Sequence, residues 1–353
     1  MKTFYNLYPQ ICSFENLLSA AKKAEKGKRS KAGVARFNVD LEKNIFQLQR
    51  ALLDHSYRPG KYRHFTVYES KKRLISAAPF RDRVVHHALC NIIEPLFEKS
   101  FIHDSYACRK GKGTHKAVQR FSDFAKINRY VFKCDIRKYF PSIDHQILQD
   151  KFERKIKDAE TFELIRTIIN SADAVDNNPI HYFAGDDLFT PLQRRRGLPI
   201  GNQTSQFFAN VYLDGFDHFI KEKLRCKYYI RYVDDFVIFD DNKMKLHNIR
   251  ELIEQHLATL RLQMHPHKSQ IFPVEQGTDF LGYRIFPSHR LIRKSNVKRF
   301  RRKLRRYQQE YADGLITLAD INQRIQSWMG HAGWANSYNL KQEIFNNFVL
   351  SKG

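Results

Sequence analysis

The stretch YYIRYVDDFVIF, residues 228–239, decides the fold of this chain. Tyr, Ile, Val and Phe lie on both sides of two adjacent carboxylates, Asp234 and Asp235, and neither Gly nor Pro interrupts them. Such residues favour a pleated, half-buried surface. The stretch therefore predicts a β-hairpin with the acidic pair at or beside its turn.

The acidic pair has two interpretations. Asp is common in tight turns, where its side chain caps the backbone, so turn chemistry explains most Asp-Asp pairs. Two like charges at close range, however, repel each other unless a cation lies between them. The apolar flanks favour this second interpretation, because charged groups among buried strand positions need compensation. The pair therefore predicts a metal site.

Another acid lies in the stretch YVFKCDIRKYFPSI, residues 130–143. Asp135 is the central acid of an apolar strand, and the aromatic pair Tyr139 and Phe140 follows before Pro141, a predicted stop. A carboxylate inside an apolar strand is costly unless it is paired or bound to a metal. Asp135 is therefore a functional candidate.

Composition favours a polyanionic partner. The 353 residues include 61 Lys plus Arg against 37 Asp plus Glu, a formal net charge of +24. This bias exceeds what solubility needs and suits nucleic acid; an acidic membrane surface is the rival. The length predicts one large domain with subdomains, or two domains.

Location follows from what the sequence lacks. No apolar run reaches the length of about 18 residues needed to span a bilayer, and residues 1–10 lack a signal-peptide core. The five cysteines occur singly, which predicts buried thiols in a reducing compartment. We expect a cytoplasmic protein with no membrane partner.

Basic elements precede the acidic strands. Helices are predicted over residues 14–53, with a break at 26–33, and strands at 64–68 and 72–75 around a turn at 69–71. Lys72 and Arg73 could face a triphosphate, although a solvated edge strand guarded by Lys explains this motif alone better. In the following helix, residues 79–97, Arg81 could pair with Asp82 or reach a phosphate.

The segment between the acidic strands ends in a small-residue loop. Helices are predicted through residues 144–170, and 171–196 reads as an irregular hairpin region. The loop GLPIGNQTSQ, residues 197–206, then leads into a helix at 207–219. Such a loop exposes backbone amides and lets a nucleotide approach closely, although as a lone pattern it is weak.

The C-terminal part is mainly helical. One helix is predicted at 244–262, with Ile253 on its buried face. A later helix is predicted to begin at Thr317 and to bury Leu318 and three later apolar residues. Between them lie Lys268, a phosphate contact or a surface charge, and a hairpin strand at 279–286. The His265-Pro266-His267 stretch just before Lys268 has no Cys or acidic residue at the spacing expected of metal ligands. The helix at 297–311 carries apolar residues on one face and Lys and Arg on the others, as expected for contact with a phosphate backbone.

These motifs together resemble reverse transcriptases. YVDD matches the Tyr-x-Asp-Asp signature, and Asp135 lies in the matching earlier strand. Further matches, in the right order, are PFRDRVVHHAL, the loop at 201–205, the Lys268 turn, FLGYRI and SWMGHAGWANSY. The resemblance implies an α+β right-hand polymerase: residues 1–132 as N-terminal extension and fingers, 133–290 as palm with a fingers return segment at 155–196, and 291–353 as a basic helical thumb. The palm is expected to be an antiparallel sheet packed on helices.

The resemblance also implies roles for individual residues. Asp135, Ile136, Asp234 and Asp235 would hold two Mg²⁺ ions, for which Mn²⁺ can substitute, and the three acids would be catalytic. Phe140 would be the steric gate against a 2′-hydroxyl, and Lys268 a proton donor or charge stabiliser at the pyrophosphate. The implied nucleotide-binding residues are Lys72, Arg73, Arg81, Tyr139, Phe140, Ile200, Gly201, Gln206 and Lys268. The implied primer and template contacts are Gly282, Tyr283, Lys298, Arg301, Arg302 and Arg305.

Two departures in the small-residue loop indicate a subfamily. Most reverse transcriptases have Gln-Gly-x-x-x-Ser-Pro here, whereas this chain has Ile200 and Gln206 at the first and last positions. This variant is similar to the enzymes of diversity-generating retroelements. The resemblance implies a template-repeat RNA copied with errors at adenines into cDNA, and a small basic accessory variability protein as partner.

Two other functions are open. The chain could be a higher-fidelity bacterial reverse transcriptase of the group II intron or retron type, which Ile200 and Gln206 argue against. It could also be a non-catalytic RNA-binding scaffold, which the intact Asp135, Asp234 and Asp235 argue against.

Overall fold

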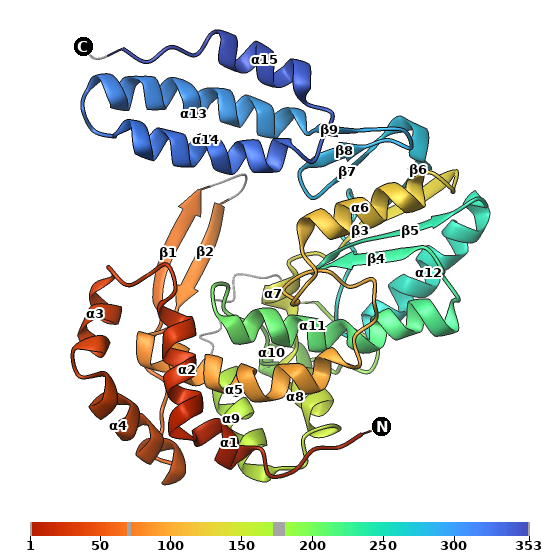
Figure 1. The fold of residues 1–353 in the computed structure, drawn as a ribbon. Coiled ribbons are helices and arrows are strands. Elements are labelled where there is room, and N and C mark those ends of the chain that lie inside the picture. The colour runs from red at the N-terminus through yellow and green to blue at the C-terminus, as the bar shows by residue number, and fades with distance from the viewer. Residues whose placement is uncertain (1, 69–71, 172–180, 352–353) are drawn as a thin grey trace.

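The computed structural model describes residues 2–68, 72–171 and 181–351. A helical N-terminal part and a central sheet with its covering helices lie next to one another, and three C-terminal helices lie over both (Figure 1). Among the described residues, no helix is long and apolar enough to cross a bilayer. The predicted α+β class is confirmed, because helices cover an antiparallel sheet.

The N-terminal part is a helical layer that carries a two-stranded sheet. Its elements are α1 (Tyr8–Cys12), α2 (Phe14–Glu25), α3 (Ala32–Val39), α4 (Leu41–Leu53), β1 (Arg63–Tyr68), β2 (Lys72–Ala77) and α5 (Phe80–Glu98). The predicted break after α2 and both predicted strands are confirmed; the predicted turn at 69–71 lies outside the described residues. The β1–β2 hairpin extends toward α14 (Figure 1).

The central sheet is antiparallel, in the order β4-β5-β3-β6. Its strands are β3 (Tyr130–Asp135), β4 (Tyr229–Tyr232), β5 (Asp235–Asp240) and β6 (Gln270–Pro273). The predicted acidic hairpin is therefore confirmed as β4 and β5. Alternate side chains point to opposite faces of a strand, and both faces of this sheet are covered by apolar cores.

Helices cover one face of the sheet, and a helix with a second small sheet covers the other. On one side Phe236 packs in the large core shared with helices α8, α11 and α12; on the other Val237 packs with α6 and the second sheet. The other elements of this part of the chain are α6 (Thr114–Ala125), α7 (Tyr139–Ser142), α8 (His145–Glu153), α9 (Ala159–Asn170), α10 (Thr190–Gln193), α11 (Gln203–His218), a π-helical turn (Phe219–Lys223), α12 (Lys243–Thr259), a 3₁₀ turn (Val274–Gln276), β7 (Thr278–Phe280), β8 (Tyr283–Ile285) and β9 (Arg290–Ile292).

The C-terminal helices α13 (Lys294–Ala312), α14 (Leu318–Ala332) and α15 (Tyr338–Asn346) share a small core of their own. The predicted capping box at the start of α14 is present, since Thr317 and Asp320 bond reciprocally. Phe300 of α13 stacks on Trp328 of α14 with ring centroids 4.0 Å apart. The prediction that Leu318 is buried is wrong: it is 55% exposed, because the first turn of α14 extends beyond this core.

Other predictions need correction. α11 begins at Gln203 rather than at 207, so Gln206 lies in its first turn. Pro141 lies inside the one-turn helix α7 instead of ending the segment, which is compatible with its missing amide at a helix start. Cys108 is exposed, whereas the other four cysteines are buried. The predicted hairpin strand at 279–286 is confirmed, as the antiparallel pair β7 and β8. Residues 172–180 of the predicted irregular region lie outside the described residues.

Neighbouring residues of α12 provide a test of this packing. Ile253 is fully buried, whereas Leu252 is 43% exposed. Ile253→Ala should lower the free energy of unfolding by about 2–5 kcal/mol, because it leaves a cavity in the core. Leu252→Ala should change it by less than about 0.5 kcal/mol. Chemical denaturation followed by circular dichroism measures both, and equal losses would contradict the assigned helix face.

Candidate active site

Val233 and Asp234 form the two-residue turn of the acidic hairpin. Tyr232 of β4 and Asp235 of β5 pair directly on either side of it. Val233 has φ 59°, a left-handed conformation that is strained for a β-branched residue. Such strain persists only where the surrounding structure enforces it.

A fully buried ion pair supplies this support. The side chains of Arg231 and Asp217 are both 0% exposed, and Nε and Nη2 of Arg231 donate to the two carboxylate oxygens of Asp217 at 2.7 Å. Nη1 donates to the Val233 carbonyl at 3.1 Å and to Oδ1 of Asn210 at 3.2 Å. The hydroxyl of Tyr229 donates to Asp217 at 2.6 Å. This network fixes the carbonyl of the strained turn.

The sheet brings the third acid to the same edge. Asp135, the last residue of β3, pairs in register with Asp235. The next amide, that of Ile136, donates to the Asp234 carbonyl at 3.1 Å. Nζ of Lys268 lies 2.8 Å from Oδ2 of Asp135. Three carboxylates and one ammonium group therefore lie together at the end of the central strands.

The carboxylates perturb one another's titration. Burial raises the pKa of Asp235 to about 7, and the charges of Asp234 and Asp135 contribute to the rise. Burial also raises the pKa of Asp234, with a further contribution from Asp135. Lys268 and Arg73 oppose the rise at Asp234. Perturbed carboxylates at one site are typical of catalytic centres.

These residues fit a divalent cation of the Mg²⁺ type. Oδ1 of Asp235 is buried and accepts no hydrogen bond in the part of the chain that the structure describes. In residues 2–68, 72–171 and 181–351, no group of three or more His, Cys, Asp or Glu forms a ready-made cage. Mg²⁺ usually takes one or two carboxylates together with substrate phosphates and water. Asp135 and Asp234 can supply these two carboxylates. The remaining ligands of Mg²⁺ would then be water and the phosphates of a nucleotide substrate.

Basic residues of the N-terminal part lie at different distances from this edge. Lys72 and Arg73 are exposed on β2, and Arg73 is close enough to affect the pKa of Asp234. Arg81 is exposed at the start of α5, with its guanidinium 5.3 Å from the ring centroid of Tyr57. The structure thus brings Arg73 toward the carboxylates and holds Arg81 against an aromatic ring.

The small-residue loop connects the central sheet region to β2. The amide of Leu198 donates to the Phe140 carbonyl at 2.9 Å, and the amide of Ser76 donates to the Ile200 carbonyl at 3.0 Å. Gly201 has φ 125°, and a Cβ there would lie 3.0 Å from the Ile75 side chain. Glycine is therefore required both by the backbone conformation and by the close approach of β2. Phe140 and Ile200 are half-buried, and Gln206 is exposed.

The comparisons with known proteins agree with this geometry. Residues 60–285, more than half of the chain, match the family described as reverse transcriptase (RNA-dependent DNA polymerase). The chain belongs to the reverse transcriptase family. It is an RNA-directed DNA polymerase, and the right-hand polymerase fold expected from the resemblance is confirmed.

Relatives of this reverse transcriptase include bacterial and intron-encoded proteins. Protein YkfC of Escherichia coli is 28% identical over 74% of this chain and 73% of its own length. The group II intron-encoded protein LtrA of Lactococcus lactis is 26% identical over 64% of this chain, which spans only 35% of LtrA. Among solved structures, apo telomerase from Candida tropicalis gives a TM-score of 0.48 at 14% identity, covering 71% of this chain and 60% of the telomerase chain.

Two predicted contacts of the reverse transcriptase need correction. The side chain of Tyr139 is buried, and its hydroxyl donates to the Ala209 carbonyl at 2.5 Å, so this side chain packs in the core and is not presented to a nucleotide. Tyr283 is also buried, and its hydroxyl bonds to His331 at 2.8 Å. Gly282 accepts a hydrogen bond from Asn296 at 3.1 Å. Gly282 and Tyr283 therefore join the second sheet to the C-terminal helices.

The predicted template cations lie on α13. Lys298, Arg301, Arg302 and Arg305 are all exposed. Arg301 is paired with Glu343 of α15 at 2.6 Å, whereas the other three have no ion pair within the described ranges. Lys298, Arg302 and Arg305 are therefore the cations of this set that no carboxylate of the described residues neutralises.

Sequence reasoning missed the Arg231–Asp217 pair. Arg231 stands two positions before Val233 and reads as an ordinary charge on a strand, while Asp217 reads as part of a helix surface. An arginine within an otherwise apolar strand was the available signal, because a buried charge requires a partner. The sequence does not say which residue is that partner, because the choice of Asp217 depends on how α11 packs under the sheet.

The buried pair yields a first prediction for this site. Arg231→Met should lower the free energy of unfolding by about 3–5 kcal/mol, because Asp217 stays buried without its partner. The double variant Arg231→Met with Asp217→Leu should recover part of this loss. Both should polymerise more slowly than the wild type, since the Val233 carbonyl loses its donor. Denaturation and primer extension measure these effects; a double variant no more stable than the single one would contradict the proposed cost.

The raised pKa of Asp235 gives a second prediction. The folded protein holds this proton up to about pH 7, whereas the unfolded carboxyl loses it near 3.8. The folded state therefore binds more protons between these values, and stability falls as pH rises through this window. In EDTA and above this pH window, the unfolding free energy of Asp235→Asn should exceed that of the wild type by about 4 kcal/mol. The difference should close as pH falls to about 4. A gap independent of pH would refute the assignment.

Proposed function

We propose that this reverse transcriptase copies a template-repeat RNA into cDNA with errors at template adenines, and that the cDNA diversifies a target gene. The observation that supports this function is the pair Ile200 and Gln206 in the small-residue loop. Ile200 replaces the amide side chain that most family members carry. Its carbonyl is held by Ser76 of β2, so an aliphatic side chain is fixed where others place a polar one. A hydrogen-bonding check on base-pair geometry is then lost.

Nucleotidyl transfer by this chain depends on residues at the sheet edge. The primer 3′-hydroxyl attacks the α-phosphorus in line, and pyrophosphate leaves. When bound, Mg²⁺ would lower the pKa of the primer 3′-hydroxyl and compensate the negative charge of the phosphates. Asp135 and Asp234, with Ile136, would hold these ions, and Asp235 supports them. Lys268, whose Nζ is 2.8 Å from Asp135, supplies positive charge or a proton to the leaving group.

Other residues orient the nucleotide and the nucleic acid. Lys72, Arg73 and Arg81 would contact the triphosphate, with Gly201 allowing close approach, and Phe140 would lie under the sugar and exclude a 2′-hydroxyl. The exposed cations of α13 would lie along the phosphate backbone of template and cDNA. A small basic accessory protein and a cytoplasmic location complete the proposal.

A higher-fidelity enzyme of the group II intron type is the second candidate. The observation that favours it is the similarity to LtrA, described as a group II intron-encoded protein. The two candidates differ in error spectrum, because only the first predicts misincorporation concentrated at template adenines.

Replacing Ile200 tests the proposal. Ile200→Gln should reduce misincorporation opposite template adenine by about two- to tenfold, the value of one regained hydrogen bond. Ile200→Leu, which restores no polar group, should leave the error rate unchanged. Sequencing of primer-extension products on RNA measures both, and Asp234→Asn should abolish Mg²⁺-dependent synthesis. An error rate that Ile200→Gln leaves unchanged, or a wild type without adenine errors, would favour the second candidate.

A further inference from the structure

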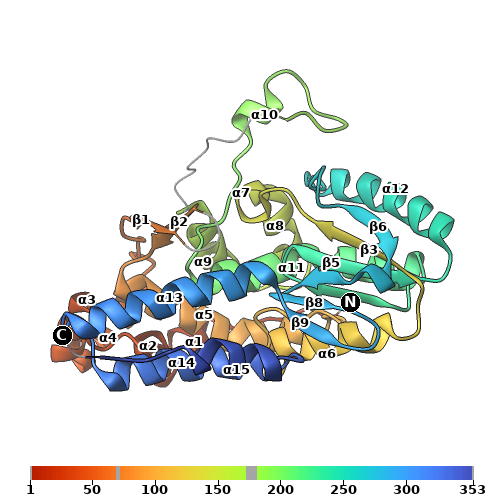
Figure 2. The ribbon, with the colours of Figure 1, turned by 90° about the horizontal axis from the view of Figure 1, so that it is seen from above.

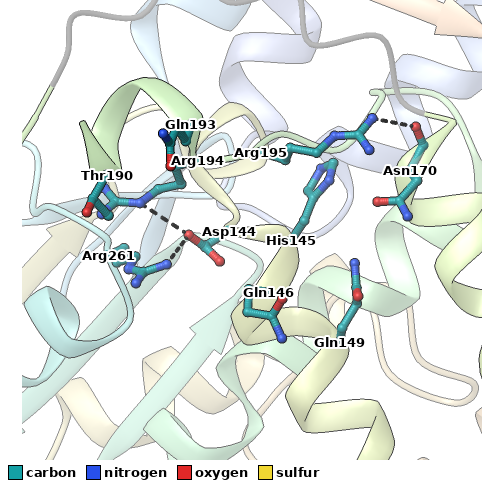
Figure 3. A pocket seen from close by; sticks show the side chains of 10 residues that line it. All are labelled: Asp144, His145, Gln146, Gln149, Asn170, Thr190, Gln193, Arg194, Arg195 and Arg261. Carbon is teal, nitrogen blue, oxygen red and sulfur yellow. Dashed lines mark hydrogen bonds and ion pairs between the residues drawn. The ribbon is translucent and has the colours of Figure 1, made fainter. Parts of the chain in front are cut away.

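A polar pocket lies behind the small-residue loop, away from the carboxylates. Its volume is about 400 Å³, within the range of small-ligand sites. The start of α8, the end of α9, α10 and Arg261 after α12 form its walls (Figure 3). None of the three catalytic acids lines it. α10 and the loop before it stand out from the rest of the molecule (Figure 2).

One carboxylate holds the wall of this pocket together. Asp144 is 1% exposed; it accepts from Arg261 at 2.6 Å and lies 3.5 Å from Nε of Arg194. It also caps α8 by accepting from the Ile147 amide at 3.0 Å. Arg194 pairs in addition with Asp186. The charges of Arg194 and Arg261 are therefore compensated within the protein.

Arg195 and His145 differ from these wall residues. Nη2 of Arg195 donates to the Asn170 carbonyl at 3.1 Å, and within the described ranges Arg195 has no carboxylate partner. Nε2 of His145 donates to the Gly197 carbonyl at 2.7 Å. Nδ1 of His145 has no hydrogen-bond partner among the described residues, although the residue is only 3% exposed. The His145 ring extends toward Arg195 in the pocket (Figure 3).

The protonation of His145 defines what the free nitrogen can bind. Burial lowers the pKa of His145, and the charge of Arg195 lowers it further. The ring is therefore neutral at physiological pH. Because a carbonyl only accepts, Nε2 carries the proton, and Nδ1 is a bare acceptor. The pocket thus offers one cation for an anion and one acceptor for a hydroxyl or amine.

Side-chain amides complete the lining. Gln149 and Gln193 both line the pocket, and neither makes a side-chain hydrogen bond within the ranges that the structure describes. Amides of this kind can donate to and accept from the edge of a nucleobase. Arginine suits a phosphate oxygen, and the 2′-hydroxyl distinguishes RNA from DNA.

We propose that this pocket binds one unpaired nucleotide of an RNA strand. The backbone phosphate lies on Arg195, the 2′-hydroxyl donates to Nδ1 of His145, and the base faces the amides of Gln149 and Gln193. The inference rests on the RNA-directed activity and not on the adenine errors. His145 would then contact the nucleotide through Nδ1 and the small-residue loop through Nε2, which donates to Gly197. The nucleotide would therefore be linked through one side chain to the loop that carries Ile200.

Equilibrium binding tests the proposal without catalysis. The probes are a fluorescent single-stranded RNA and a DNA of the same sequence, titrated with the full chain in EDTA and followed by anisotropy. In His145→Gln, the new amide keeps an N–H donor for the Gly197 carbonyl, and its oxygen replaces the ring Nδ1 without the fixed geometry of the ring. It should weaken RNA binding about three- to tenfold and leave DNA binding unchanged. Arg195→Gln should weaken both about tenfold.

A matched arginine provides the control. Arg166 of α9 is exposed and lies outside the pocket; among the described residues its one ion pair is with Glu163 at 3.3 Å. Arg166→Gln makes the same change in net charge and should leave both affinities within about twofold. Because Arg195 and Arg166 are both on the surface, these two variants give a readout even if His145→Gln fails to fold.

The position of the RNA gives a second readout. RNA containing 4-thiouridine should photo-crosslink to peptides that contain residues 145–149 or 190–195, and Arg195→Gln should reduce these crosslinks. Equal effects of Arg195→Gln and Arg166→Gln, equal loss of RNA and DNA binding in His145→Gln, or crosslinks confined to other peptides would overturn the proposal. Failure of the adenine-error prediction would leave these binding results unaffected.

Discussion

The mutual repulsion of three carboxylates is the constraint on which this structure depends. Asp135, Asp234 and Asp235 lie together because β3 and β5 pair in a register that places two of them opposite one another, and the turn supplies the third. The pKa of Asp235, raised by burial and by its neighbours, records the cost of holding these groups together. Lys268 offsets part of this charge. A divalent cation and a triphosphate can offset the rest, so the same arrangement that is costly alone is suited to the reaction.

Holding the acids requires a rigid support beneath them. The strained backbone of Val233 is fixed by Arg231, and Arg231 is fixed in turn by Asp217 of α11. A buried ion pair contributes little net stability, because desolvation cancels much of its attraction. Its value here is positional. Apolar cores on both faces of the sheet exclude water from this network and keep the turn in one conformation.

The small-residue loop gives the second link between parts of the molecule. It bonds to the Phe140 carbonyl and to the Ser76 amide of β2, so residues far apart in the sequence share one short segment of backbone. On its other side Gly197 accepts from His145 of the polar pocket. Ile200 and Gln206 therefore lie in a segment that contacts both β2 and the polar pocket.

The sequence by itself determined the acidic hairpin, the apolar strand that carries Asp135, the buried face of α12 and the capping box of α14. Each is a local pattern with the period of one strand or helix, so neighbouring residues are enough to predict it. The tertiary structure alone decided that Tyr139 and Tyr283 turn into the core, that Arg231 pairs with Asp217, and that His145 and Arg195 share a pocket. These contacts join elements from separate parts of the chain. Their partners are therefore set by how the layers pack, and no pattern within a single helix or strand encodes that packing.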